Sequence, residues 1–192
     1  MNRLVVAITG ATGSIYGIRL LESLRTQRDL ETHLIISGPG KRTLVEETDW
    51  SVSDVEALAT HVYDNKDIGA AIASGSFRTA GMVVAPCSIK TAAAIAACLS
   101  QNLIARAADV TLKEGRPLIL LVRETPLHTG HLRMMLALSE MGAVVLPPMP
   151  AFYNRPKELD DVVNHTVARV LDRLRIPQTM VGEWRGTHPR TI

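Results

Sequence analysis

The chain has 192 residues, a formal net charge of +2 and a composition that is 46% hydrophobic, 21% charged and only 4% aromatic. This length suits a single domain (1–192), and the small, evenly spread charge and scarce aromatic residues argue against a nucleic-acid partner. The two cysteines offer no disulfide framework, which predicts a cytoplasmic protein. We expect no signal peptide, because a strand begins by about Arg3, and no membrane segment, because no apolar run approaches ~18 residues.

The first predicted strand, Leu4–Ile8, is apolar without alternation, which is typical of a strand covered on both faces. Six small residues, Thr9–Ser14, follow it, and then comes a helical stripe of Ile15, Ile18, Leu21 and Leu24. A strand, a glycine-rich loop and a helix N-terminus predict an anion site, most often for a phosphate; a tight βα turn without a ligand is the alternative. The glycine spacing matches neither the dinucleotide fingerprint nor the P-loop.

The rest of the chain alternates strands and helices. Strands are predicted at Thr32–Ser37, Val62–Tyr63, Met82–Ala85, Pro117–Val122 and Ala143–Leu146. Helices are predicted from Lys41, from a capping box at Ser53 to Ala59, and at Ile89–Leu99, Leu103–Glu114 (capped by Asn102), His131–Met141 and Asp160–Leu174, with a helical turn at 68–73. The pattern predicts an α/β fold: a doubly wound, mostly parallel sheet in a flavodoxin- or Rossmann-like three-layer sandwich, with its core at about 3–174 and a polar tail at 175–192.

In such folds ligands bind beyond the carboxyl ends of the strands, where one site is built by several loops. The loops expected there are Thr9–Ser14, Ser37–Gly40, Pro86–Thr91, Arg123–Pro126 and Pro147–Tyr153.

Basic residues suggest a phosphate subsite. Arg106 and Lys113 lie seven apart on one predicted helix face, and an ion-pair ladder through Asp109 is the alternative reading. Lys113 and Arg123, together with Arg169, would suit a phosphate, although Arg169 alone reads as a solvated helix residue.

Other polar groups are weaker candidates. Glu124, beside Arg123, could hold or donate a proton, whereas Cys87 reads as a small buried sulfur. His128 and His131 would be half of a metal site but have no thiolate partners, and Ser88 lies outside a hydrolase elbow, so no metal is expected. The residues alone predict a phosphate-bearing cofactor beside an apolar, aromatic and basic subsite, without specifying the reaction.

Motifs along residues 4–174 resemble those of the UbiX-type flavin prenyltransferases, formerly described as 3-octaprenyl-4-hydroxybenzoate carboxy-lyases. They are TGATGSIYGIRLL, ETHLIIS, EETD, SGSF, PCSIKT, NLIARAADVTLKEGRPLILLVRETPLH, MGAVVLPPMPAFYNRP and VARVLD. The resemblance implies a metal-independent enzyme that joins a dimethylallyl group, delivered as the phosphate, to reduced FMN at N5 and C6. It also implies homo-oligomers, usually dodecamers, that bind FMN near a subunit interface and supply prenylated FMN to a UbiD-type decarboxylase.

The resemblance also implies roles for individual residues. Tyr153, Lys113 and Arg169 would hold the dimethylallyl phosphate, and Arg106, Arg123 and Glu124 would complete its pocket. Glu47 would face the reacting edge of the flavin, which makes Glu47, Glu124 and Lys113 the catalytic candidates, and Trp184 would help to close the site. The residues expected against the flavin are Gly10, Ala11, Thr12, Ser37, Ser88, Ile89, Lys90, Thr91 and Arg123.

Two departures from the family pattern carry expectations. Thr12 stands where serine is common, and Gly38-Pro39-Gly40 replaces a more helical start of the second helix, so this loop is predicted to be less helical.

The rival functions are an FMN-dependent decarboxylase of the cysteine-peptide type, a non-catalytic FMN-binding protein and direct decarboxylation of an aromatic acid.

Overall fold

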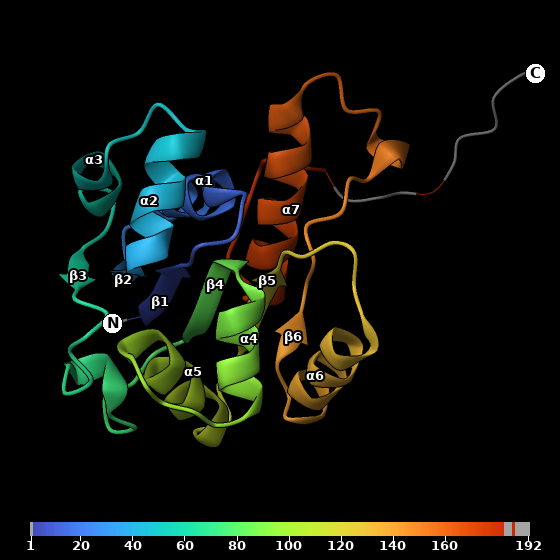
Figure 1. Ribbon diagram of the computed structural model, residues 1–192. Coiled ribbons are helices and arrows are strands. Elements are labelled where there is room, and N and C mark those ends of the chain that lie inside the picture. The colour runs from blue at the N-terminus through green and yellow to red at the C-terminus, as the bar shows by residue number, and fades with distance from the viewer. Residues whose placement is uncertain (1, 183–185, 187–192) are drawn as a thin grey trace, which may run out of the picture.

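A computed structural model describes residues 2–182 and 186. Its centre is a six-stranded sheet in the order β3-β2-β1-β4-β5-β6, in which every neighbouring pair is parallel (Figure 1). The strands are β1 (Asn2–Ile8), β2 (Leu30–Ile36), β3 (His61–Tyr63), β4 (Gly81–Cys87), β5 (Leu118–Val122) and β6 (Val144–Val145).

Helices cover both faces of this sheet. One face carries α1 (Ser14–Leu24), α2 (Gly38–Glu47), α3 (Val52–Glu56) and α7 (Leu159–Arg173). The other carries the short turn η1 (Ala71–Ala73), α4 (Ile89–Ala96), α5 (Leu103–Lys113) and α6 (Thr129–Glu140), and a second turn, η2 (Phe152–Asn154), lies beside α7 (Figure 1). The predicted three-layer α/β fold is confirmed.

The core divides into two apolar clusters, one on each face of the sheet. In β1, Leu4, Val6 and Ile8 pack with α1 and α7, whereas Val5 and Ala7 pack toward α4 and α5. Successive strand residues point to opposite faces, so a strand covered on both sides must be apolar at every position. This requirement explains the unbroken apolar run that begins the sequence.

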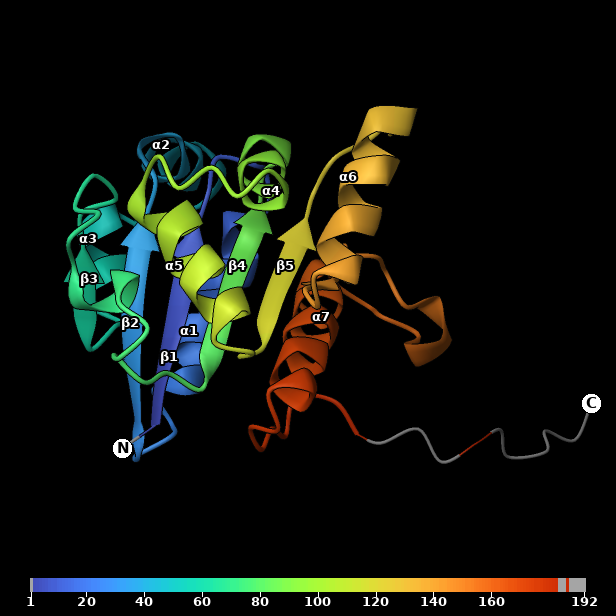
Figure 2. The same ribbon diagram turned by 90° about the horizontal axis from the view of Figure 1, so that it is seen from below.

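The chain order reverses beside β1. From β1 the chain builds β2 and β3 outward in one direction, and then it crosses back to β4, β5 and β6 on the other side. The crevice at such a reversal, beyond the carboxyl ends of the strands, is where ligands bind in open α/β sheets. In Figure 2 the arrowheads of β2, β4 and β5 point to this edge, where α2 and α4 lie.

The second helix begins earlier than the sequence indicated. We predicted a start near Lys41 and a loop of low helicity at 38–40, but α2 begins at Gly38. The side chain of Ser37 caps the helix by accepting a hydrogen bond from the Gly40 N–H (3.0 Å), and Pro39 occupies the first turn, where its missing N–H has no helical acceptor. Tertiary contact and capping therefore outweigh the low helix propensity of glycine.

Other boundaries moved by a few residues. The cap of α3 is Ser51 and not Ser53, and α4 ends at Ala96 and not Leu99, whereas Asn102 caps α5 as predicted. β4 continues through Pro86 to Cys87, because Cys87 pairs with Val122 of β5 after a shift in register, and the Pro86 carbonyl accepts hydrogen bonds from Thr9. No helix within 2–182 is long and apolar enough to cross a bilayer.

Two glycines in the first turn of α2 make a matched test of packing at this edge. A Cβ on Gly40 would lie 2.7 Å from the Ile8 carbonyl oxygen, whereas a Cβ on Gly38 would meet nothing within 4 Å. We expect Gly40→Ala to lower the free energy of unfolding by about 1–3 kcal/mol, because backbone must move, while Gly38→Ala is neutral or slightly stabilising. Urea unfolding at one protein concentration measures both; equal midpoints for the two variants would contradict this packing.

Candidate functional site

The carboxyl ends of β1 and β4 are joined by one buried hydroxyl group. Thr9 Oγ1 donates a hydrogen bond to the Pro86 carbonyl (2.8 Å) and accepts one from the Ser88 N–H (2.8 Å), and the Thr9 N–H also reaches Pro86 (3.2 Å). Thr9 is 1% exposed, so these bonds form without competition from water. They fix the glycine-rich loop beside the first residues of α4.

Neighbouring loops are tied to the same edge. The Ser37 N–H donates to the Ile8 carbonyl (3.0 Å) and the Arg123 N–H donates to the Cys87 carbonyl (3.0 Å). The expected flavin residues of four strands therefore gather at one edge: Gly10, Ala11, Thr12, Ser37, Ser88, Ile89, Lys90, Thr91 and Arg123.

The N-terminus of α4 offers backbone donors at this edge. Ser88 caps the helix through the Thr91 N–H (3.3 Å), and its hydroxyl donates to Thr91 Oγ1 (3.1 Å). The first N–H groups of a helix, here those of Ile89 and Lys90, have no intrahelical acceptor and attract anions. The Lys90 side chain is exposed beside them.

The N-terminus of α1 already holds an anion. The Glu47 carboxylate, from the last residue of α2, accepts hydrogen bonds from the N–H groups of Gly13 (2.8 Å) and Ser14 (3.2 Å). The anion-binding backbone predicted at this strand-loop-helix turn therefore binds a carboxylate of the protein itself, and the phosphate expected there stays a prediction. Gly13, with φ 100°, adopts the left-handed backbone that turns these N–H groups toward Glu47.

Arg123 and Glu124 follow β5 at the same edge and are exposed. Oε1 of Glu124 accepts a hydrogen bond from the Thr125 N–H (3.0 Å), which holds the carboxylate close to its own loop. A cation and a carboxylate therefore stand side by side next to the α4 N-terminus.

Cys87 ends β4 beneath this edge, and its side chain is fully buried. Burial raises the pKa of the Cys87 thiol to about 12, so it stays protonated and unreactive at neutral pH. This agrees with the prediction of a small buried sulfur. The ring centres of His128 and His131 lie 3.6 Å apart with the rings tilted by 31°, and Nδ1 of His128 accepts a hydrogen bond from the Gly130 N–H at the start of α6.

Tyr153 and Arg169 lie apart from the strand ends, in a cavity of about 530 Å³ along α7 that is also lined by His165 and Gln178. Tyr153 Oη lies 3.2 Å from Nε2 of His165, and Arg169 is exposed and pairs with Asp172 (3.3 Å). Burial, followed by the charge of Arg169, holds the pKa of His165 below its usual value. The structure thus brings Tyr153 and Arg169 together.

Arg106 and Lys113 lie on α5, which returns the chain from the carboxyl edge to the amino ends of the strands. Arg106 pairs with Asp109 (2.9 Å), but Lys113 pairs with Glu114 (2.6 Å), so the predicted ladder forms only in its first half. In the sequence, Lys113 comes shortly before the first residue of β5. In space, it lies near Gly75, which precedes β4, so it stands by the amino ends of both strands. A single chain therefore does not bring Lys113 to the loops that hold Arg123, and Trp184 lies outside the described residues.

Comparisons with known proteins match this arrangement. The flavoprotein family model matches residues 1–171. A flavin prenyltransferase UbiX of Thauera aromatica is 55% identical over 190 residues, covering 99% of this chain and 97% of that protein. The chain belongs to the UbiX flavin prenyltransferase family.

Two solved structures of UbiX-type proteins extend the likeness. A dodecameric FMN-dependent UbiX-like decarboxylase from Escherichia coli O157:H7 is 52% identical, with a TM-score of 0.94 over 96% of this chain and 100% of that one. The structure of AnUbiX in complex with FMN and dimethylallyl pyrophosphate is 45% identical, with a TM-score of 0.95 over 97% and 99% of the two chains.

Sequence reasoning missed two residues that the structure brings into the candidate site. Thr9 was counted only as a small loop residue, although its position at the carboxyl end of the first strand was a signal. His165 was not singled out, although it lies four residues before Arg169 and so on the same face of the last helix.

The Thr9 hydroxyl can be tested by an isosteric change. Thr9→Val keeps the volume but leaves the Ser88 N–H without its acceptor, and we expect it to lower the free energy of unfolding by about 1–3 kcal/mol and to weaken flavin binding. Thr9→Ser retains the hydroxyl and should bind flavin nearly as well as the parent. Fluorescence titration with FMN measures the affinity; equal affinity in the Val and Ser variants would show that this hydroxyl does not organise the loops.

Proposed function

We propose that this chain transfers a dimethylallyl group from dimethylallyl phosphate to reduced FMN and releases prenylated FMN. The observation that carries the proposal is the 55% identity, over nearly its whole length, to a protein named as a flavin prenyltransferase UbiX. The relative of known structure in complex with FMN and dimethylallyl pyrophosphate supports FMN and a phosphorylated dimethylallyl donor as the ligands. The product would serve a UbiD-type decarboxylase, and the free thiols of Cys87 and Cys98 suit a reducing cytoplasm.

The residues at the carboxyl edge fit FMN. Gly10 and Gly40 lack side chains where the loops after β1 and β2 pack together: a Cβ on Gly10 would clash with Pro39, and one on Gly40 with the Ile8 carbonyl. The α4 N-terminus would hold the phosphate of FMN through backbone N–H groups, with Ser88 and Thr91 beside it. When bound, reduced FMN supplies the nucleophilic N5 and C6 atoms that accept the dimethylallyl group.

The basic residues would stabilise the leaving phosphate. The bond between the allylic carbon and the phosphate oxygen breaks with its electron pair on the oxygen, so negative charge grows there as the bond lengthens. Arg123 can donate two parallel hydrogen bonds to such a group. Arg169 and Tyr153, which lie together but apart from the strand ends, would contact the same phosphate from a neighbouring copy. Glu124, beside Arg123, would hold the proton that the departing phosphate accepts.

A second copy of the chain would complete this clamp. Lys113 lies near the amino ends of the strands, away from Arg123, so both can contact one phosphate only if a neighbouring copy brings its α5 to the site. Exposed apolar side chains offer surface for such contact, among them Leu132, Leu136, Phe152 and Leu159. The related E. coli protein is dodecameric, and a dodecamer is the assembly that we propose for this chain.

The first test is an anaerobic reaction with FMN, a reductant and dimethylallyl phosphate, followed by mass measurement of the extracted flavin. Transfer would add one C5H8 unit, roughly 68 Da. If the flavin stays unmodified although FMN is bound and reduced, the proposal is wrong, and the protein is a flavin-binding protein or a decarboxylase. Release of carbon dioxide from an aromatic acid or a cysteine-terminated peptide would identify the decarboxylase.

The shared clamp can be tested by subunit mixing. Arg123→Ala and Lys113→Ala should each abolish most of the transfer, because both residues contact the prenyl phosphate. If the two residues come from different copies, random co-assembly of the two variants restores about a quarter of the sites. The matched control mixes the double variant with inactive Arg123→Ala, which restores none. Absence of recovery in the mixed oligomer would place both residues in one chain's site.

A further inference from the structure

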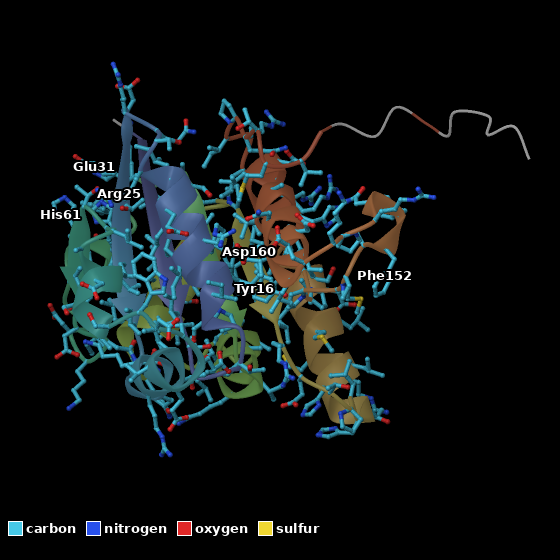
Figure 3. All side chains as sticks on the ribbon, turned by 90° about the horizontal axis from the view of Figure 1, so that it is seen from above. Tyr16, Arg25, Glu31, His61, Phe152 and Asp160 are labelled. Atoms are coloured by element: carbon cyan, nitrogen blue, oxygen red, sulfur yellow. The ribbon has the colours of Figure 1, made fainter. Side chains whose placement is uncertain are left out.

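Three possible metal ligands gather at the outer edge of the sheet, on β2 and β3. His33 of β2 lies opposite His61 of β3 in the parallel register, and Glu31 precedes His33 by two residues, so the three side chains share one face of the sheet. One ligand atom from each residue lies within 4.8 Å of the others. Figure 3 shows Glu31 and His61 together at this outer side, on the two neighbouring strands.

His33 has a nitrogen that its surroundings leave unsatisfied. The side chain is 2% exposed, and Nδ1 lies 2.9 Å from the Tyr63 hydroxyl. Nε2 is buried and has no hydrogen-bond partner among the described residues, and it lies 3.8 Å from Oε2 of Glu31. Burying a polar atom without a partner is unfavourable. This nitrogen, which faces the Glu31 carboxylate, therefore indicates a binding site for a ligand.

The chemistry of the three groups suits a divalent metal. Burial, followed by the charge of His61, lowers the pKa of His33 to about 4, so the imidazole is neutral at pH 7 and has no proton to lose on binding. If Nδ1–H donates to the Tyr63 oxygen, the Nε2 lone pair points to the cluster, which is the usual support of a metal-bound histidine. The hydrogen bond from Arg3 holds the pKa of Glu31 below its usual value, so Glu31 is a carboxylate.

We propose that Glu31, His33 and His61 form a zinc-binding site that ties the three-residue edge strand β3 to β2. Two imidazole nitrogens and a carboxylate oxygen are a usual zinc ligand set, with water in the fourth position. Binding at about 2.0–2.2 Å requires the ligand atoms to approach one another, and the exposed His61, now stacked on His33 at 4.7 Å, is the side chain free to turn.

One neighbouring charge opposes the metal. Nε of Arg3 lies 3.0 Å from Oε2 of Glu31, and its guanidinium sits 4.4 Å from the centre of the Phe77 ring. Oε2 is also the oxygen nearest to Nε2 of His33, so Glu31 must turn its carboxylate to keep Arg3 on one oxygen and bind zinc with the other. The repulsion weakens the site without blocking it, and removal of this charge should therefore strengthen binding.

The site is separate from the flavin edge. Glu31 stands near the amino end of β2, whereas the proposed flavin loops follow the carboxyl ends of the strands. Zinc would act on the stability of the edge strand and not on the transfer reaction. The inference is thus independent of the proposed prenyl transfer.

The test is equilibrium dialysis of the chelator-treated protein against zinc ions, with bound metal measured by mass spectrometry. Cys98→Ser serves as the background, because Cys98 is an exposed thiol that could bind zinc by itself. We expect one zinc ion per chain, and His61→Gln, an exposed change that spares the core, should weaken binding at least tenfold. Arg3→Gln should tighten it. Zinc should also raise the unfolding temperature of the background protein by about 5 °C but leave that of His61→Gln unchanged.

His128→Gln is the matched control, because it removes one ring of the other close histidine pair. It should bind zinc as the background protein does. Equal zinc binding in His61→Gln and the background protein would overturn the proposal, as would loss of zinc in His128→Gln alone. Absence of any bound zinc would also overturn it. Cobalt in place of zinc should give the intense visible absorption of a four-coordinate site, and that spectrum should disappear in His61→Gln.

Discussion

The site depends first on the hydroxyl of Thr9. It is the buried group that joins the carboxyl ends of β1 and β4, where the chain order of the sheet reverses. A parallel sheet delivers its loops to one edge but does not specify how they lie against each other. Because Thr9 accepts from Ser88, just before α4, and donates to Pro86 near the end of β4, the glycine loop and the α4 N-terminus are held as one surface.

The N-termini of α1 and α4, which both adjoin that surface, differ in charge. Glu47 neutralises the N-terminus of α1, whereas α4 has no acidic residue in its first turn, and its N-terminus is the end that we propose for the phosphate of FMN. Arg123 follows β5 next to α4, and we propose that its charge serves a second anionic group. The arrangement explains how one edge can serve two phosphate-bearing ligands without placing them on the same donors.

The sequence predicted the fold and the edge well because both follow from local patterns: unbroken apolar strands, small residues after each strand, and capped helices. It failed where the outcome depends on residues far apart in the chain. The capping of α1 by Glu47 requires the end of α2 to lie over the start of α1, and no spacing rule contains that contact. The early start of α2 depends likewise on Gly40 packing against Ile8. The family resemblance supplied the reaction, which the residues alone did not.

The position of Lys113 could have been predicted, and it leads to the strongest constraint on assembly. A helix that connects two parallel strands must return the chain to the amino edge, so the last residue of α5 cannot lie with loops at the carboxyl edge. If Lys113 contacts the same phosphate as Arg123, it does so from another copy, and the isolated chain then lacks part of its own clamp. Activity would follow subunit association, and a change that only weakens the interface would reduce transfer without touching either ligand.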